Sequence, residues 1–120
     1  MIIKRGEIHL ASLDPTIGRE ISKTRPVVII SNDINNRFSG TITVLPITSM
    51  NLGKIYPFEV KLPKGSGNLP KDSKVKADQI RTLDKRRIIK AIGMLDDESL
   101  VRIESALKIH LGIEITDDLG

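Results

Sequence analysis

The sequence predicts a small α+β domain in which one helix packs on a strongly curved or barrel-like antiparallel sheet. Short apolar or alternating segments recur along the chain between turn-forming residues, which is typical of strands. Only one segment, near the C-terminal end, has a strong helical pattern. The chain has 120 residues, of which 39% are hydrophobic, which predicts a single domain with one globular core.

The first expected strand covers residues 7–13, where Ile8 and Leu10 alternate with more polar neighbours. The segment that follows contains Pro15 and Gly18 among polar residues. This composition predicts a long loop before the second strand.

The second expected strand, residues 25–31, contains the uninterrupted apolar run V-V-I-I, which indicates burial on both faces. Residues 32–40 are rich in Asn and predict a turn. A third strand is expected at residues 41–48, where Pro46 indicates a sheet edge or a bulge because proline has no N–H to donate.

Three shorter strands are expected at residues 57–62, 74–78 and 87–93. The intervening segment 63–73 combines Pro, Gly and Lys and predicts a mobile basic loop. Residues 79–85 are interpreted as a helical turn between the last two strands.

The C-terminal helix is predicted from residue 96 to Gly112, with acids in its first turn and Gly112 as the C-cap. Basic groups lie near its end. Its apolar stripe consists of Leu100, Ile103, Leu107 and Leu111.

Charge is distributed unevenly along the chain. Residues 1–95 hold 17 basic and 8 acidic side chains, a net charge of +9, whereas residues 96–120 hold 2 basic and 7 acidic ones, a net charge of −5. A positive field of this size attracts polyanions, although charge also serves solubility, and the count alone does not choose between these roles.

Several classes of protein are disfavoured by composition. The chain has no cysteine, which excludes disulfides, thiol nucleophiles and thiolate-bound zinc. It has no apolar run near the roughly 18 residues of a membrane span, and its start lacks a signal-peptide pattern, so we expect a cytoplasmic protein. The two histidines, His9 and His110, lie at opposite ends of the chain without HExxH or GxSxG motifs, which disfavours metal or Ser-His-Asp catalysis.

Polar side chains instead gather at the ends of the expected strands: Glu20, Arg25, Thr48, Ser49, Lys76, Asp78, Gln79 and Arg81. The segments that contain them are similar to those of a known family. In order along the chain they read G-R-E, R-P-V-V, P-I-T-S and D-Q-I-R-T-L-D-K. This order resembles the MazF/PemK-like toxins of bacterial type II toxin–antitoxin modules over about residues 4–112. We therefore expect a toxin domain at 1–112 and an acidic extension without an assigned role at 113–120.

The resemblance implies a CcdB/Kid/MazF-like (SH3-like) antiparallel β-barrel with a C-terminal helix, acting as a homodimer. It also implies a sequence-specific endoribonuclease that cleaves single-stranded RNA, chiefly mRNA, without a metal or other cofactor. In such enzymes the 2′-hydroxyl attacks the adjacent phosphorus and leaves 2′,3′-cyclic phosphate and 5′-hydroxyl ends. The implied partner is a MazE-like antitoxin with a disordered acidic tail.

The family's catalytic arginine before proline matches Arg25, and its threonine at the end of the third strand matches Thr48. Pro26 and the rigid strand behind it would hold the guanidinium for a phosphate. We expect Arg25 to stabilise the phosphorane and Thr48 to donate to a nonbridging oxygen. A guanidinium exchanges protons poorly at neutral pH, so a carboxylate is the easier general base, and Glu20 and Asp78 both remain candidates.

The resemblance and the polar cluster together suggest an RNA-binding set of Arg19, Ser49, Tyr56, Lys76, Gln79 and Arg81. Structural roles are the alternative: Arg25 could form an ion pair with Glu20, Thr48 could be present for its β propensity, and Asp78 and Gln79 could hold a turn or a dimer interface. The low aromatic content, with only Phe38, Tyr56 and Phe58, leaves few rings for base stacking.

Two other functions are compatible with the same fold. CcdB-like toxins bind and poison DNA gyrase through their C-terminal helix and perform no catalysis. The third possible function is that of an inactive regulator or a basic binding module. The G-R-E segment, Arg25 and Thr48 favour the nuclease.

Overall fold

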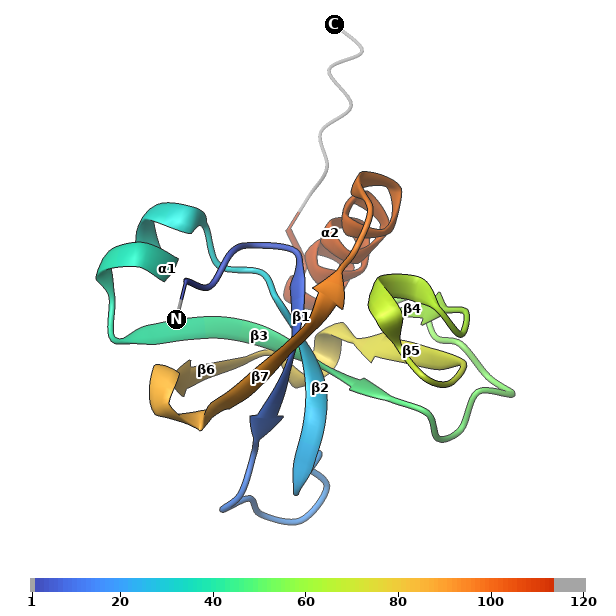
Figure 1. The fold of residues 1–120 in the computed structure, drawn as a ribbon. Coiled ribbons are helices and arrows are strands. Elements are labelled where there is room, and N and C mark those ends of the chain that lie inside the picture. The colour runs from blue at the N-terminus through green and yellow to red at the C-terminus, as the bar shows by residue number, and fades with distance from the viewer. Residues whose placement is uncertain (1, 114–120) are drawn as a thin grey trace, which may run out of the picture.

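The computed structural model describes residues 2–113 and contains seven strands, two α-helices and three 3-10 turns (Figure 1). In chain order the strands and helices are β1 (Glu7–Ser12), β2 (Thr24–Ile29), α1 (Asp33–Phe38), β3 (Thr41–Thr48), β4 (Glu59–Leu62), β5 (Ser73–Lys76), β6 (Arg81–Asp84), β7 (Ile88–Met94) and α2 (Asp97–Leu111). The acidic extension expected at 113–120 lies outside the described residues, apart from Ile113.

The strands form one antiparallel sheet in the order β4-β5-β3-β2-β1-β7, with β6 paired to β3. Strand β3 runs across the molecule from the α1 side to the β4–β5 side, and α2 packs at one end of the strongly twisted sheet (Figure 1). Among the described residues β6 and β7 do not pair, so the barrel is not strictly closed. The predicted fold class is confirmed.

All six expected strands form, with ends within two residues of the prediction. Two other assignments are wrong. Residues 33–38 form α1 rather than a turn, because the Asn32 side chain accepts a hydrogen bond from the Asn35 amide and caps the helix. Residues 81–84 form β6 rather than a helical turn, since they pair with β3 between two 3-10 turns, Ala77–Gln79 and Lys85–Arg87.

Pro46 does not mark a sheet edge, because β3 has neighbours on both sides. On one side Pro46 lies opposite Val27 of β2. On the other side, residues 41–44 pair with β6 and residues 47–48 pair with β5. Pro46 therefore lies where β3 changes partners, a position at which its missing N–H removes no bond from that side.

The core has two parts because β2 is buried on both faces, as its apolar run predicts. Val28 belongs to a cluster that includes Leu45 and Ile103 and is covered by α2. Val27 and Ile29 belong to a second cluster, on the opposite face of the strand. Such burial makes β2 a rigid support for the residues at its start.

Helix α2 has the predicted caps and most of the predicted stripe. Asp96 accepts a hydrogen bond from the Ser99 amide, and Gly112 adopts a left-handed conformation at the C-terminus. Ile103 is buried, but Leu111 is 49% exposed, which contradicts its assignment to the buried stripe. The core extends only to the middle of the helix, where Ala106 is the last buried residue.

The segment expected to be a mobile basic loop contains a short turn, Ser66–Asn68, that packs closely on β7. The Asn68 side-chain amide donates to the carbonyl of Ile92 at 3.1 Å, and Leu69 is buried in the core. A Cβ atom at Gly93 would collide with the Gly67 carbonyl. Gly93 is therefore required for this contact between backbones.

We expect Gly93→Ala to lower the free energy of unfolding by about 1–3 kcal/mol, because backbone atoms must move to admit the methyl group. Gly40→Ala is the matched control, since a Cβ there meets nothing within 4 Å. Urea unfolding at one fixed protein concentration measures both variants. Equal stability of the two variants would contradict the close approach of Gly93 and Gly67.

Candidate functional site

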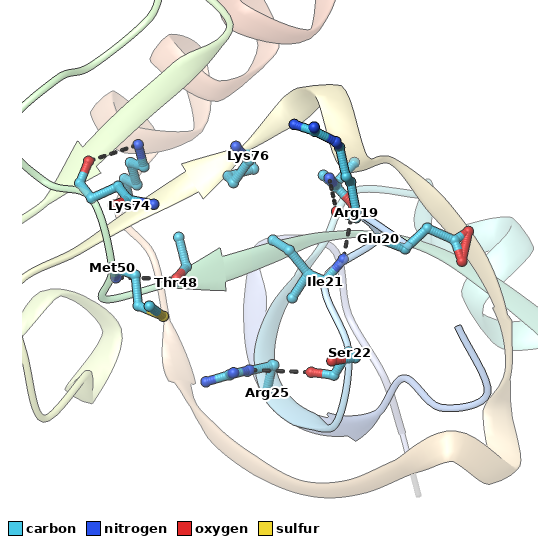
Figure 2. Close-up of a pocket in the computed structure, with 11 residues that line it drawn as sticks. Arg19, Glu20, Ile21, Ser22, Arg25, Thr48, Met50, Lys74 and Lys76 are labelled. Atoms are coloured by element: carbon cyan, nitrogen blue, oxygen red, sulfur yellow. Dashed lines mark hydrogen bonds between the residues drawn. The ribbon is translucent and has the colours of Figure 1, made fainter. Parts of the chain in front are cut away.

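A cavity of about 290 Å³ opens between the β1–β2 loop (residues 13–23), the adjoining ends of β2 and β3, and strand β5 (Figure 2). It brings together six of the residues predicted from the sequence: Arg19, Glu20, Arg25, Thr48, Lys76 and Gln79. Lys74 also lines this cavity and was not predicted as a site residue. The sequence spacing could have indicated it, because Lys74 and Lys76 lie two residues apart in a strand and therefore face the same side.

Arg25 and Thr48 enter the cavity from neighbouring strands (Figure 2). Strands β2 and β3 pair Val27 with Pro46, and extending that register by two residues places Arg25 opposite Thr48. The strands separate at this point, since β3 turns to pair with β5. The two side chains thus line the same cavity from the ends of neighbouring strands.

The local hydrogen bonds of both side chains leave their functional groups available. The Arg25 Nε donates to the carbonyl of Ser22 at 3.2 Å, so its terminal amino groups remain free to contact an anion. The Thr48 Oγ1 accepts a hydrogen bond from the Met50 amide at 3.1 Å. Its own hydroxyl hydrogen can therefore be donated to a ligand.

Among residues 2–113, Glu20 is the only acidic residue that lines the cavity. Its side chain is exposed and points away from Arg25 and Thr48 (Figure 2), and its carboxylate accepts a hydrogen bond from the Ile17 amide at 2.7 Å. Within residues 2–113 the ion pairs do not include Arg25 with Glu20. The alternative in which Arg25 only serves as an ion-pair partner of Glu20 is therefore not observed.

Gln79 and Arg81 hold the β1–β2 loop from the β6 side. The Gln79 amide oxygen accepts from the Ile21 amide at 3.1 Å, and its nitrogen donates to the carbonyl of Arg19 at 3.2 Å. Arg81 donates to the carbonyl of Leu13 at 2.9 Å, at the start of the same loop. Both side chains position the loop that carries Arg19 and Glu20.

The remaining predicted residues lie outside the cavity. Asp78 is 3.9 Å from the Lys76 ammonium, and its Oδ1 is buried without a hydrogen-bond partner. Ser49 lines a smaller neighbouring cavity of about 190 Å³ that also contacts Arg25. Tyr56 stacks on Phe58 with ring centroids 5.3 Å apart.

Three charged side chains form a partly buried cluster beside the cavity. Glu59 accepts hydrogen bonds from the ammonium groups of Lys74 and Lys76, each at 3.1 Å. Burial alone would raise the pKa of the Glu59 carboxyl, but the Tyr56 amide and the two ammonium groups outweigh it and hold that pKa below its ordinary value. Glu59 thus remains charged and compensates two lysines.

Residues 2–113 contain no group of three or more His, Cys, Asp or Glu side chains that could hold a metal ion. Neither α-helix in this range is both long and apolar enough to cross a membrane.

Comparison with known proteins places the chain in a family. Residues 4–111 match the model of the PemK-like, MazF-like toxin of type II toxin–antitoxin systems. The chain is 40% identical over 113 residues to endoribonuclease EndoA of Bacillus subtilis, covering 94% of this chain and 97% of the relative. It is 41% identical over 117 residues to endoribonuclease MazF of Staphylococcus epidermidis, covering 97% of each.

Solved structures agree with this assignment. MazF from Deinococcus radiodurans superposes with a TM-score of 0.82 at 29% identity, covering 94% of this chain and 99% of that one. A MazE–MazF complex from the same organism gives a TM-score of 0.74 at 26% identity, covering 95% and 99% of the two chains. The chain belongs to the PemK-like, MazF-like family of type II toxins.

We expect Glu59→Gln to lower the free energy of unfolding at pH 7 by about 3–5 kcal/mol, because it leaves buried Lys74 without its counter-ion. The pKa of Glu59 is lower in the folded protein than its ordinary value of 4.5, so its contribution is complete above that pH. It is lost as the pH falls through the lowered pKa. Urea unfolding at several pH values should therefore show the wild type and the variant converging in acid.

The exposed Glu98 provides the control, since Glu98→Gln removes one negative charge without leaving a buried lysine unpaired. A constant difference between wild type and Glu59→Gln from neutral to strongly acidic pH would contradict the assigned ionisation.

Proposed function

We propose that this protein is the toxin of a type II toxin–antitoxin module and a sequence-specific endoribonuclease that cleaves single-stranded RNA. The observation that carries the proposal is the cavity in which Arg25 and Thr48 face the same opening, with Arg19 and Lys76 around them. Such a group of donors fits a phosphodiester. Membership of the toxin family and the naming of its relatives as endoribonucleases support the same activity.

The proposed reaction is an internal transesterification in which the nucleophile is a hydroxyl of the RNA itself. The 2′-hydroxyl loses its proton to a carboxylate, and its oxygen forms a bond to the adjacent phosphorus. The bond from phosphorus to the 5′ oxygen then breaks, and that oxygen takes up a proton from solvent. The products are a 2′,3′-cyclic phosphate and a 5′-hydroxyl.

Arg25 and Thr48 stabilise the charge that develops on the phosphoryl oxygens. The free terminal amino groups of Arg25 match two oxygens of one phosphate, while the hydroxyl of Thr48 donates to a nonbridging oxygen. Burial of β2 behind Pro26 keeps Arg25 in place, so little reorganisation is needed in the transition state.

Glu20 is the proposed general base in preference to Asp78. In the part of the chain that the structure describes, Glu20 is the only acid lining the cavity, whereas Asp78 lies outside it. The Glu20 carboxylate must turn away from the Ile17 amide to reach the 2′-hydroxyl, which its exposed position in the loop allows. In the transition state it would complete the set of groups around the phosphate.

The proposed partners follow from charge and family. The +9 charge of residues 1–95 favours an acidic antitoxin segment, of the MazE kind, as well as RNA. A MazE–MazF complex is among the structures that this fold resembles. We expect a homodimer that acts in the cytoplasm.

Incubation of the purified protein with a long single-stranded RNA in EDTA, followed by mapping of the ends, tests the function. We expect cyclic phosphate ends at a repeated short motif. Arg25→Ala and Thr48→Ala should each slow cleavage on the order of 10² to 10³-fold while remaining folded. Intact RNA together with inhibited DNA gyrase would instead support the gyrase-binding alternative.

Two variants test which carboxylate is the general base. Glu20→Gln should lower kcat on the order of 10² to 10⁴-fold, and Asp78→Asn should have a much smaller effect. Single-turnover cleavage rates at saturating protein measure both. A larger loss in Asp78→Asn, with its thermal unfolding unchanged, would transfer the role of base to Asp78.

A further inference from the structure

Lys74 and Lys76 lie on the same face of β5, but their ammonium groups differ in what they can still bind. The Lys74 Nζ donates to the carbonyls of Asn51 and Lys54 at 2.9 and 3.2 Å and to the Glu59 carboxylate at 3.1 Å. An ammonium has three N–H donors, so all of those on Lys74 are in use. Its side chain is only 4% exposed.

The Lys76 ammonium does not use all of its N–H donors. Its Nζ donates to Glu59 at 3.1 Å and lies 3.9 Å from Asp78, beyond hydrogen-bond distance. Its side chain is 23% exposed and lines the cavity. Lys76 can therefore contact a phosphate without giving up an existing bond, whereas Lys74 cannot.

The bonds of Lys74 and Glu59 converge on the β3–β4 loop (residues 49–58). Lys74 binds two of its carbonyls, and Glu59 accepts from the Tyr56 amide at 3.0 Å. Glu59 and Lys74 lie on paired strands, β4 and β5, so their hydrogen bonds attach the loop to the sheet. A buried, hydrogen-bonded ion pair fixes such a geometry more firmly than a surface contact.

The same loop also contacts Thr48. The Met50 amide donates to the Thr48 Oγ1, which leaves the hydroxyl hydrogen of Thr48 free to be donated to a ligand in the cavity. Met50 and Asn51 also line the cavity themselves. A shift of the loop would therefore move both the cavity wall and the orientation of a proposed catalytic hydroxyl.

We infer that Lys74, with Glu59, is a positioning residue that sets the β3–β4 loop and the Thr48 hydroxyl for cleavage, and that Lys76 rather than Lys74 binds the RNA phosphate. The inference rests on the proposed nuclease function for its catalytic consequence. The anchoring of the loop itself does not depend on RNA.

Lys74→Met, Lys76→Met and Lys64→Met remove one positive charge each and form a matched set. Lys64 is exposed and lines none of the cavities described, so its variant reports the effect of net charge alone. Three quantities are compared: kcat and KM for cleavage, the salt dependence of affinity, and hydrogen exchange of the loop amides without RNA. Affinity is measured with an oligonucleotide that spans a mapped cleavage site and carries 2′-deoxyribose there.

Lys74→Met should lower kcat about 10 to 100-fold, speed exchange of the Met50 and Tyr56 amides, and leave the salt slope equal to that of Lys64→Met. Lys76→Met should act chiefly on KM, leave loop exchange unchanged, and make the slope of log affinity against log salt shallower by about 0.7. A shallower slope in Lys74→Met, with loop exchange as in the wild type, would overturn the inference.

Ammonium NMR of the wild type gives a second test that does not require Lys74→Met to fold. The Lys74 signal should be protected from exchange with water and should not shift when RNA is added, whereas that of Lys76 should shift. A shift of Lys74 alone would overturn the assignment. If RNA neither binds nor is cut, the proposed function fails, while loop exchange and Lys74 protection still decide whether the loop is anchored.

Discussion

The pairing of β3 with three other strands is the constraint on which the rest of this structure depends. The strand holds β2 along one side, and along the other it passes from β6 to β5 at Pro46. Beyond that point β2 and β3 no longer pair, and the opening between them is where Arg25 and Thr48 lie. The cavity is thus a consequence of how the sheet is connected, and its walls are the rigid ends of buried strands.

Two loops complete this rigid opening, and each is held by side chains from other parts of the sheet. Gln79 and Arg81 bind the backbone of the β1–β2 loop, whereas Lys74 and Glu59 bind that of the β3–β4 loop. The basic character of the site and its geometry are therefore linked, since Lys74 contributes charge to the cavity while all its hydrogen bonds go to the loop and to Glu59.

The sequence predicted most of the fold because most of its elements carry their signals locally. Alternation or apolar runs located the six strands, and acids together with Gly112 located α2. The strand at residues 81–84 was not predicted, because it forms through pairing with β3, which is distant in the sequence. Helix α1 was not predicted because its short length and Asn-rich composition resemble a turn, and only the Asn32 cap distinguishes it.

For the site, the resemblance to a family identified Arg25 and Thr48 as candidates. No local sequence pattern distinguishes Lys76, whose ammonium has free donors, from Lys74, whose donors are all in use.

Strand β7 has only one strand partner, β1, within the described residues, so its other side has no neighbouring strand, although the Asn68 side chain donates to the Ile92 carbonyl. Such a border is a template on which further chains can add as strands and aggregate. The chain limits this hazard with an exposed Lys90 on the strand and with two register shifts in its pairing to β1, which bend the border away from a flat ribbon. These features protect the exposed edge of the open barrel against strand addition, while the separated ends of β2 and β3 leave room for a ligand.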